Sequence, residues 1–503
     1  MKKILWICDS FSEKTAYANI SEKLCKILSN RYKIIYFFIN TLSTSNQKNS
    51  YTIHIPKEIL AQHNNPSIKD YYYNILVGCY MLSDIITIEK PDIVVSINDY
   101  QIVQKHLEIV KSVSKCIFIP YVPIDCEKLP VSFFDSLKKA DFILTMTEHS
   151  RKILSNSFSN VFLLPHYIDN CYYPLELSKK EIRKKIYPSN IDIEDDSIII
   201  LNINNSGIRK RLDIFIESLY ILNNKICISN ILYVLKTNKD FNLHEMILLN
   251  NKKYNIDLTR HFILLTEKMN NNDMNLLYNS ANIFVTTTSG EGFGLTPFES
   301  ICCNVFTLVP DNTCYPEYFP LDFLIKCETK TYKEGRDIIE IPRDDIYMVF
   351  IQGIPSYKNT TIEYLQDCSN FSNFNCRKEI IDCNNFESQL NDIVKEKTPF
   401  QLIIKVDITN SFIDTENIIK IYRKVDFNNF EKWDFTISSY DSFDEYISKV
   451  RIPCKNDLTD KIINYIKNPT MYKNIIKKTK NKLIKKLSLS VIEEQLLSLP
   501  FFV

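Results

Sequence analysis

Residues 289–300 read SGEGFGLTPFES, and this stretch decides how the rest of the chain is interpreted. The chain has 503 residues but only 7 glycines, and Gly290, Gly292 and Gly294 all belong to this stretch. Glycine has no β-carbon, so such a cluster indicates backbone freedom or the close approach of another group. The sequence TPFE at 296–299 is typical of a helix start, with the threonine as N-cap and the glutamate three residues later. The stretch therefore predicts a loop that feeds a helix N-terminus, where unpaired amides can hold an anion. Asn304 is expected to end this helix in the left-handed conformation.

The composition narrows the classes of protein. Hydrophobic residues make up 45% of the chain, charged residues 24%, and the net charge is +1, which indicates a globular protein without a field that attracts nucleic acid. The apolar run that starts MKKILWIC stops at Asp9, too early for a signal peptide, and no run reaches the ~18 apolar residues of a membrane span. Fifteen cysteines without a CxxC pair favour reduced thiols in a cytoplasmic protein, and none has zinc-ligand spacing.

Short apolar runs alternate with helical patterns through the first two thirds of the chain, which predicts parallel sheets covered by helices on both faces. The first series of predicted strands is 3–8, 34–39, 92–97, 116–122, 141–147 and 160–164, with helices such as 15–29 and 149–157 between them. A second series follows the polar stretch 176–196: strands 197–203, 230–236, 261–266, 282–287 and 305–309, with a helix at 209–222. Two doubly wound domains place a ligand between them, because each sheet binds at the carboxyl ends of its strands.

We therefore predict an α/β fold with four parts: Rossmann-like domains at 1–175 and 176–329, an inserted α/β element at 330–452, and C-terminal helices at 453–503. The element at 330–452 does not continue the alternation of apolar runs and helical patterns. It is expected to contain strands at 401–408 and 434–438 and a helix at 415–424. Its role cannot be assigned from the sequence.

A basic turn follows the strand at 197–203. Arg209, Lys210 and Arg211 lie where the next helix is expected to begin, and cations in a first helical turn oppose the helix dipole by about 0.3–1 kcal/mol each. A bound diphosphate would make the cations favourable at this position, because its negative charge attracts them. The alternatives are that these cations are a solvated turn, and that Glu299 only closes a capping box with Thr296.

Residues 291–299, EGFGLTPFE, resemble the E-x7-E signature of the retaining GT-B glycosyltransferases, family 4 in particular. Other segments resemble landmarks of that family and occur in its order: LPHYIDNCYYP at 164–174, RKRLD at 209–213, and the helix at 276–282 that leads to the signature strand. The resemblance covers about residues 1–325 and 455–495. It implies a GT-B fold, two Rossmann-like domains facing across a cleft.

The resemblance also implies roles for single residues. Glu299 would bind the nucleotide ribose, Glu291 the donor sugar, and Arg209 and Lys210 the diphosphate whose charge grows as the sugar–phosphate bond breaks. Lys210 and Glu291 would be the catalytic residues. The loop residues that would line the donor are Gly292, Phe293, Gly294, Leu295 and Thr296. No cofactor is expected, and no metal either, since these cations carry the charge and the chain has no Asp-x-Asp pair.

The acceptor side departs from the family pattern. The loop after the first strand, residues 9–15, has no glycine, although family members usually carry a glycine-rich loop there. Many members also place a histidine where this chain has IPYVPIDCEKLP, residues 119–130, which contains none. We expect Asp9, Tyr121, Asp125 and His166 on this side, although a histidine in an interdomain turn is more often structural than catalytic.

These patterns predict a hexosyltransferase-like enzyme that moves a sugar from a nucleotide-diphosphate sugar to a glycan, lipid-linked or protein acceptor with retention. The alternatives are a nucleotide-sugar epimerase or a phosphorylase of the same fold, and a non-catalytic nucleotide-sugar-binding module. The lysine-rich segment 473–486 raises membrane contact as a further alternative, but a helix packed on the protein with a solvated lysine face is the favoured interpretation.

Overall fold

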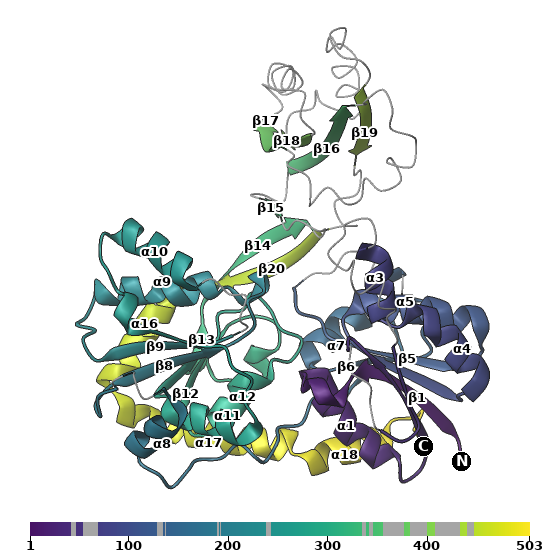
Figure 1. Ribbon diagram of the computed structural model, residues 1–503, viewed down its shortest axis with the longest axis horizontal. Helices are drawn as coiled ribbons and strands as arrows, with labels where there is room; N and C mark the ends of the chain where they lie inside the picture. Colours follow the sequence, from purple (N-terminus) through teal and green to yellow (C-terminus); the bar gives the residue numbers. More distant parts are fainter. Residues whose placement is uncertain are drawn as a thin grey trace.

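The structure is a computed structural model that describes residues 1–41, 47–53, 69–127, 134–135, 137–188, 191, 193–237, 243–333, 339–341, 346–355, 377–382, 400–407, 433–439 and 447–502. Two parallel sheets, each covered by helices, form two domains that lie side by side (Figure 1). This is the arrangement of a GT-B fold, and the predicted fold class is confirmed.

The first domain contains a seven-stranded parallel sheet of order β3-β2-β1-β4-β5-β6-β7. Its strands are β1 Lys3–Asp9, β2 Lys33–Ile39, β3 Ser50–Thr52, β4 Ile93–Ile97, β5 Ile117–Val122, β6 Ile143–Thr145 and β7 Val161–Leu163. Its helices are η1 Phe11–Glu13, α1 Ala16–Leu28, α3 Lys69–Leu76, α4 Cys79–Glu89, α5 Tyr100–Val113 and α7 Glu148–Ser155. Both faces of β1 are buried: Trp6 belongs to one apolar cluster and Ile7 to another, which explains the continuous apolar run of this strand.

The second domain contains a six-stranded sheet of order β10-β9-β8-β11-β12-β13. Its strands are β8 Ile198–Ile203, β9 Ile231–Lys236, β10 Phe262–Leu265, β11 Ile283–Val285, β12 Phe306–Pro310 and β13 Leu324–Ile325. Its helices are α8 Lys179–Ile186, η3 Ile208–Lys210, α9 Leu212–Asn223, α10 Leu243–Tyr254, η4 Thr259–His261, α11 Asn271–Ser280, α12 Leu295–Cys302, η5 Tyr315–Glu317 and η6 Leu321–Phe323. The strand order reverses between β8 and β11, and this switch point is where an open α/β sheet binds its ligand.

The predicted strands of both series are present, with ends that differ by a few residues. The short strands β3 and β13 were not predicted. The helix predicted at 209–222 was wrong at its start: Arg211 has a left-handed backbone (φ 47°), so η3 ends before it and α9 begins at Leu212. The three cations therefore precede the helix and do not lie in its first turn.

Between β13 and the C-terminal helices the chain forms two small sheets. Strands β14 Cys327–Lys333 and β20 Ile447–Pro453 pair antiparallel, with β15 Ile339–Ile341 beside β14. Beyond this stalk, defined as β14 and β20, stands a four-stranded sheet formed by β16 Ile346–Pro355, β17 Arg377–Asp382, β18 Phe400–Asp407 and β19 Trp433–Ser439 (Figure 1). The strands predicted at 401–408 and 434–438 correspond to β18 and β19, while the helix predicted at 415–424 lies outside the described residues.

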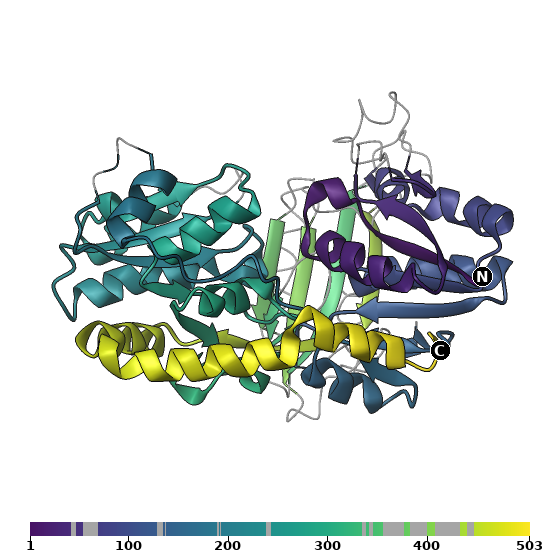
Figure 2. The same ribbon diagram turned by 90° about the horizontal axis from the view of Figure 1, so that it is seen from below.

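Three helices follow: α16 Lys455–Lys467, α17 Pro469–Leu487 and α18 Leu489–Ser498. Figure 2 shows α17 and α18 running beneath both domains. The end of the chain returns to the first domain, where Phe501 packs against Phe142 with ring centroids 4.9 Å apart. The apolar side of α17, which includes Ile476 and Leu483, is buried, as expected for the packed-helix interpretation of the lysine-rich segment. Among the described residues, no helix combines the length and the apolar character needed to cross a membrane.

Candidate functional site

The glycine-rich loop between β11 and α12 lies against the first domain. A β-carbon on Gly290 would overlap the carbonyl oxygen of Asp125, and one on Gly292 would overlap the ring of Pro123. Asp125 and Pro123 follow β5 of the first domain, so these glycines allow the two backbones to meet. Gly294 serves a different purpose, because its φ of 72° is a left-handed conformation that a side chain disfavours.

The basic turn after β8 is held by the end of β11. The Thr287 hydroxyl donates to the carbonyl oxygens of Lys210 and Arg211 at 3.0 and 2.9 Å. The Ser289 N–H donates to the Arg209 carbonyl at 2.8 Å. These bonds occupy the backbone carbonyls of residues 209–211, and the side chains of Arg209 and Lys210 are both directed to the glycine-rich loop.

Glu291 receives both cations. Its carboxylate pairs with the Lys210 ammonium and with Arg209 Nη1, the latter at 3.0 Å. Burial would raise the pKa of Glu291, but Arg209 and Lys210 lower it to about 2, so the side chain is a carboxylate at neutral pH. Arg209 also meets Asp125 of the first domain at 3.1 Å and remains 37% exposed, whereas Lys210 is 13% exposed. Two adjacent cations therefore lie at the domain junction, and Arg209 keeps accessible surface for a further anion.

Glu299 lies on α12 beside Tyr278 of α11, whose hydroxyl donates to its carboxylate at 2.6 Å. Burial raises the pKa of Glu299 to about 7, although the Tyr278 hydrogen bond opposes the shift. The capping-box alternative is wrong, because the N-cap of α12 is Gly294 and not Thr296. No side chain within the described part of the chain caps this N-terminus, so its first amides are not satisfied in that way. The helix ends before Asn304, which has the predicted left-handed backbone (φ 61°).

On the first-domain side, Asp9 is fully engaged by its neighbours. Its carboxylate accepts hydrogen bonds from Thr15 Oγ1 at 2.7 Å, Asn40 Nδ2 at 2.9 Å and Asn98 Nδ2 at 3.3 Å. Thr15 is also the N-cap of α1, so Asp9 fixes the loop of residues 9–15 that follows β1. Asp125, in contrast, lies at the junction in contact with Arg209.

Tyr121 and His166 are buried behind the glycine-rich loop. The Tyr121 hydroxyl donates to the Leu164 carbonyl at 2.5 Å, and the ring meets His166 edge-on at 5.9 Å. The His166 ring lies 5.0 Å from that of Phe293 and is 2% exposed, and neither ring nitrogen has a hydrogen-bond partner in the described residues. Burial lowers the pKa of His166 to about 3, so the ring is neutral.

Tyr278, Thr287 and Thr288 are site residues that the sequence interpretation did not identify. The Thr288 hydroxyl donates to the Gly290 carbonyl at 2.7 Å and thereby shapes the loop from within. A signal was present in the run of three threonines and a serine at 286–289, which is unusual directly after a buried strand. Tyr278 lies in the segment that carried the family resemblance, but nothing in that pattern indicated its bond to Glu299.

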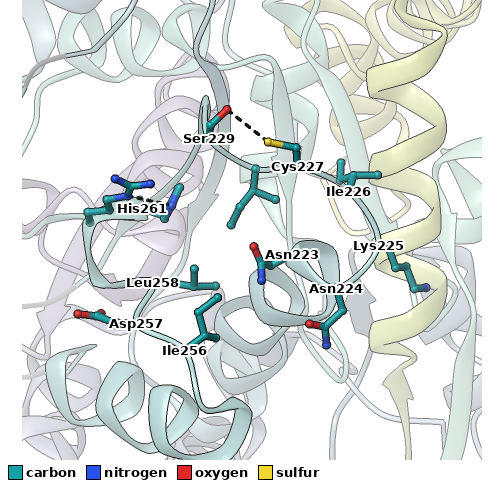
Figure 3. A pocket seen from close by; sticks show the side chains of 12 residues that line it. Asn223, Asn224, Lys225, Ile226, Cys227, Ser229, Ile256, Asp257, Leu258 and His261 are labelled. Atoms are coloured by element: carbon teal, nitrogen blue, oxygen red, sulfur yellow. Dashed lines mark hydrogen bonds between the residues drawn. The ribbon is translucent and has the colours of Figure 1, made fainter.

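A separate depression of about 630 Å³ lies between the C-terminus of α9 and η4 (Figure 3). Lys225, Cys227, Ser229 and Asp257 are among its lining residues. Residues 226–230 lead into β9, so this depression is at the amino ends of the strands. The glycine-rich loop lies at the opposite, carboxyl ends of the strands. Open α/β sheets bind their ligands at these carboxyl ends, at the switch point of the strand order.

Residues 183–327 match the family model of "Glycosyl transferases group 1". This segment contains the basic turn, the glycine-rich loop and α12, and the match supports a glycosyltransferase. No curated protein matches the chain.

Similar solved structures include a sucrose-phosphate synthase from Thermosynechococcus elongatus (13% identity, TM-score 0.48, covering 65% of this chain and 86% of that chain). A second is a trehalose-phosphate synthase from Burkholderia xenovorans in complex with glucose-6-phosphate (11% identity, TM-score 0.47, covering 63% of this chain and 87% of that chain). A third is the HepE protein of Anabaena in complex with UDP-glucose (12% identity, TM-score 0.45, covering 65% of this chain and 86% of that chain). At these identities and TM-scores the likenesses carry nothing about substrate.

Proposed function

We propose that the protein is a retaining glycosyltransferase that moves a sugar from a nucleotide-diphosphate sugar to an acceptor without a metal ion. The observation that carries the proposal is the pairing of Arg209 and Lys210 with Glu291 at the switch point of the second sheet. Helix α12 begins at Leu295, directly after the glycine-rich loop that contains Glu291. The two cations and the first amides of this helix therefore lie at the same carboxyl ends of the strands, and both favour a bound anion.

Each group has a part in this mechanism. Arg209 and Lys210 take the charge of the diphosphate as the sugar–phosphate bond breaks, which stabilises the leaving group. Glu291 holds hydroxyls of the donor sugar, and Glu299 accepts hydrogen bonds from the ribose. The amides of Phe293, Gly294 and Leu295 line the diphosphate and the sugar. Asp125, which faces Arg209 from the first domain, lies where the acceptor approaches.

The direct test is to incubate the protein with UDP-, GDP-, ADP- and dTDP-sugars, with and without a panel of glycan and lipid-linked acceptors. The proposal expects transfer or slow donor hydrolysis that is unchanged by EDTA, with the anomeric configuration of the product retained by NMR. Loss of activity in EDTA would contradict the metal-independent mechanism. Interconversion of donors without an acceptor would identify an epimerase, and donor binding without turnover across the panel would identify a binding module.

A cytoplasmic location is part of the proposal. It is supported by the absence of disulfides among the cysteines that lie in the described residues. Fractionation of the producing cells tests it.

A further inference from the structure

The loop of residues 311–313, between β12 and η5, joins three parts of the molecule. It contacts the stalk of β14 and β20, the glycine-rich loop, and the segment that follows β5 in the first domain. Asp311, Asn312 and Thr313 each make at least one of these contacts. None of the three was singled out in the sequence, and the donor site proposed above does not include them.

Asn312 is fully buried and its side chain forms a bridge. Its amide Nδ2 donates to the carbonyl oxygen of Thr288 at 3.0 Å and to that of Arg451, on β20, at 2.9 Å. The two amide protons thus connect Thr288, at the start of the glycine-rich loop (the proposed donor loop), directly to β20 of the stalk. Arg451 makes a second contact with the same loop, since its guanidinium meets Asp311 at 3.0 Å.

Thr313 extends this bridge to Glu291. Its hydroxyl donates to Asn312 Oδ1 at 3.3 Å and accepts the Glu291 N–H at 3.1 Å. The Thr313 N–H donates to Glu127 of the first domain at 3.2 Å. Thr313 has a left-handed backbone (φ 41°), which is costly for a β-branched residue and is retained only where surrounding contacts hold it.

We propose that residues 311–313 are a positioning element that couples the inserted strands to the donor site through the chain Arg451–Asn312–Thr313–Glu291. A displacement of the stalk acts on the Arg451 carbonyl, and Asn312 and Thr313 transmit it to the backbone of Glu291. The inserted sheet thereby regulates how the Glu291 carboxylate is presented to the donor sugar. This inference rests on the proposed donor site.

Thr313→Val is the sharpest variant, because valine keeps the shape and the backbone strain of threonine and removes only the hydroxyl. Thr459→Val is the matched control: Thr459 is also buried and loses one hydrogen bond, to the Lys455 carbonyl at 2.7 Å within α16, and it is not part of the chain from Arg451 to Glu291. We expect Thr313→Val to lower kcat about tenfold while the donor KM changes less than about twofold, because we assign to Glu291 contacts with the donor sugar that strengthen as the sugar–phosphate bond breaks. Equal kcat values in the two variants would overturn the coupling to Glu291.

The stalk side is tested by hydrogen exchange in the full-length Asn312→Ala variant. We expect the backbone amides of residues 447–453 and of residues 288–292 both to exchange faster than in the wild type and in Thr459→Val. Unchanged exchange in either segment would overturn the bridge. If the wild-type protein neither binds nor turns over any nucleotide sugar, the proposed function fails, whereas the exchange result still decides whether Asn312 joins the two segments.

Discussion

The two sides of the domain junction are built differently. On the second-domain side, the two cations of the basic turn, Arg209 and Lys210, both pair with one carboxylate of the glycine-rich loop, Glu291. On the first-domain side, the Asp9 carboxylate accepts hydrogen bonds from Thr15, Asn40 and Asn98 and holds its own loop in place. The difference is that the charged groups of the second domain meet at the domain junction, where we propose the donor site, while Asp9 in the first domain stabilises its own loop.

The largest expected effect on activity is that of Lys210→Ala, which removes one of the two cations on the second-domain side of the junction. Removing the cation nearest to Glu291 should lower kcat by about 10²–10³, the usual cost of losing one group that stabilises developing charge. Donor KM should change less. Lys225→Ala, which removes a lysine paired with Asp460 at 2.7 Å on the surface of the same domain, is the control and should leave kcat unchanged. Near-normal turnover in Lys210→Ala would remove this residue from the site.

Gly290→Ala tests the contact between the domains. The new β-carbon would overlap the Asp125 carbonyl, so the donor loop has to move away from the first domain. We expect kcat/KM to fall about a hundredfold, since a displacement of about 1 Å at a reacting centre costs about that much. Gly207→Ala is the matched control, because there the nearest atom to the new β-carbon is the side-chain oxygen of Asn205, at 3.2 Å. Equal losses in both variants would contradict the packing.

If Glu299 binds the ribose as proposed, donor binding should depend on pH. The pKa of Glu299 is raised to about 7 by burial, so its carboxylate is ionised above that pH and protonated below it. The donor Kd should therefore rise about tenfold from about pH 8 to about pH 6, by linkage of binding to deprotonation. His166 does not contribute, because its pKa of about 3 lies outside this range. Glu299→Gln should bind more weakly and without the pH dependence, and a persistent dependence in that variant would assign it to another group.

Asp9→Asn should have the smallest effect on donor chemistry. The substitution weakens a buried network of three hydrogen bonds, so we expect the free energy of unfolding to fall by about 1–3 kcal/mol. Donor hydrolysis should stay within about twofold of wild type. A severe loss of transfer at unchanged stability would show that Asp9 contacts the acceptor.

The sequence was sufficient for the features that depend on local pattern. The apolar run at 3–8 predicts the first strand, and the glycine cluster predicts the loop before α12. The sequence was not sufficient to predict contacts between segments that are distant along the chain. Nothing near Gly290 indicates that Asp125 lies against it, and Asn312 reads as an ordinary turn residue until β20 is placed beside it. The start of α9 was misplaced for a local reason, the left-handed conformation of Arg211, which is rare for a residue other than glycine.

A crystal structure of the protein soaked with a nucleotide-diphosphate sugar would show directly whether the donor binds at the glycine-rich loop. We expect the diphosphate beside Arg209 and Lys210 at the N-terminus of α12, the sugar hydroxyls at Glu291 and the ribose at Glu299. A nucleotide bound in the depression of Figure 3, or anywhere away from the glycine-rich loop, would contradict this expectation.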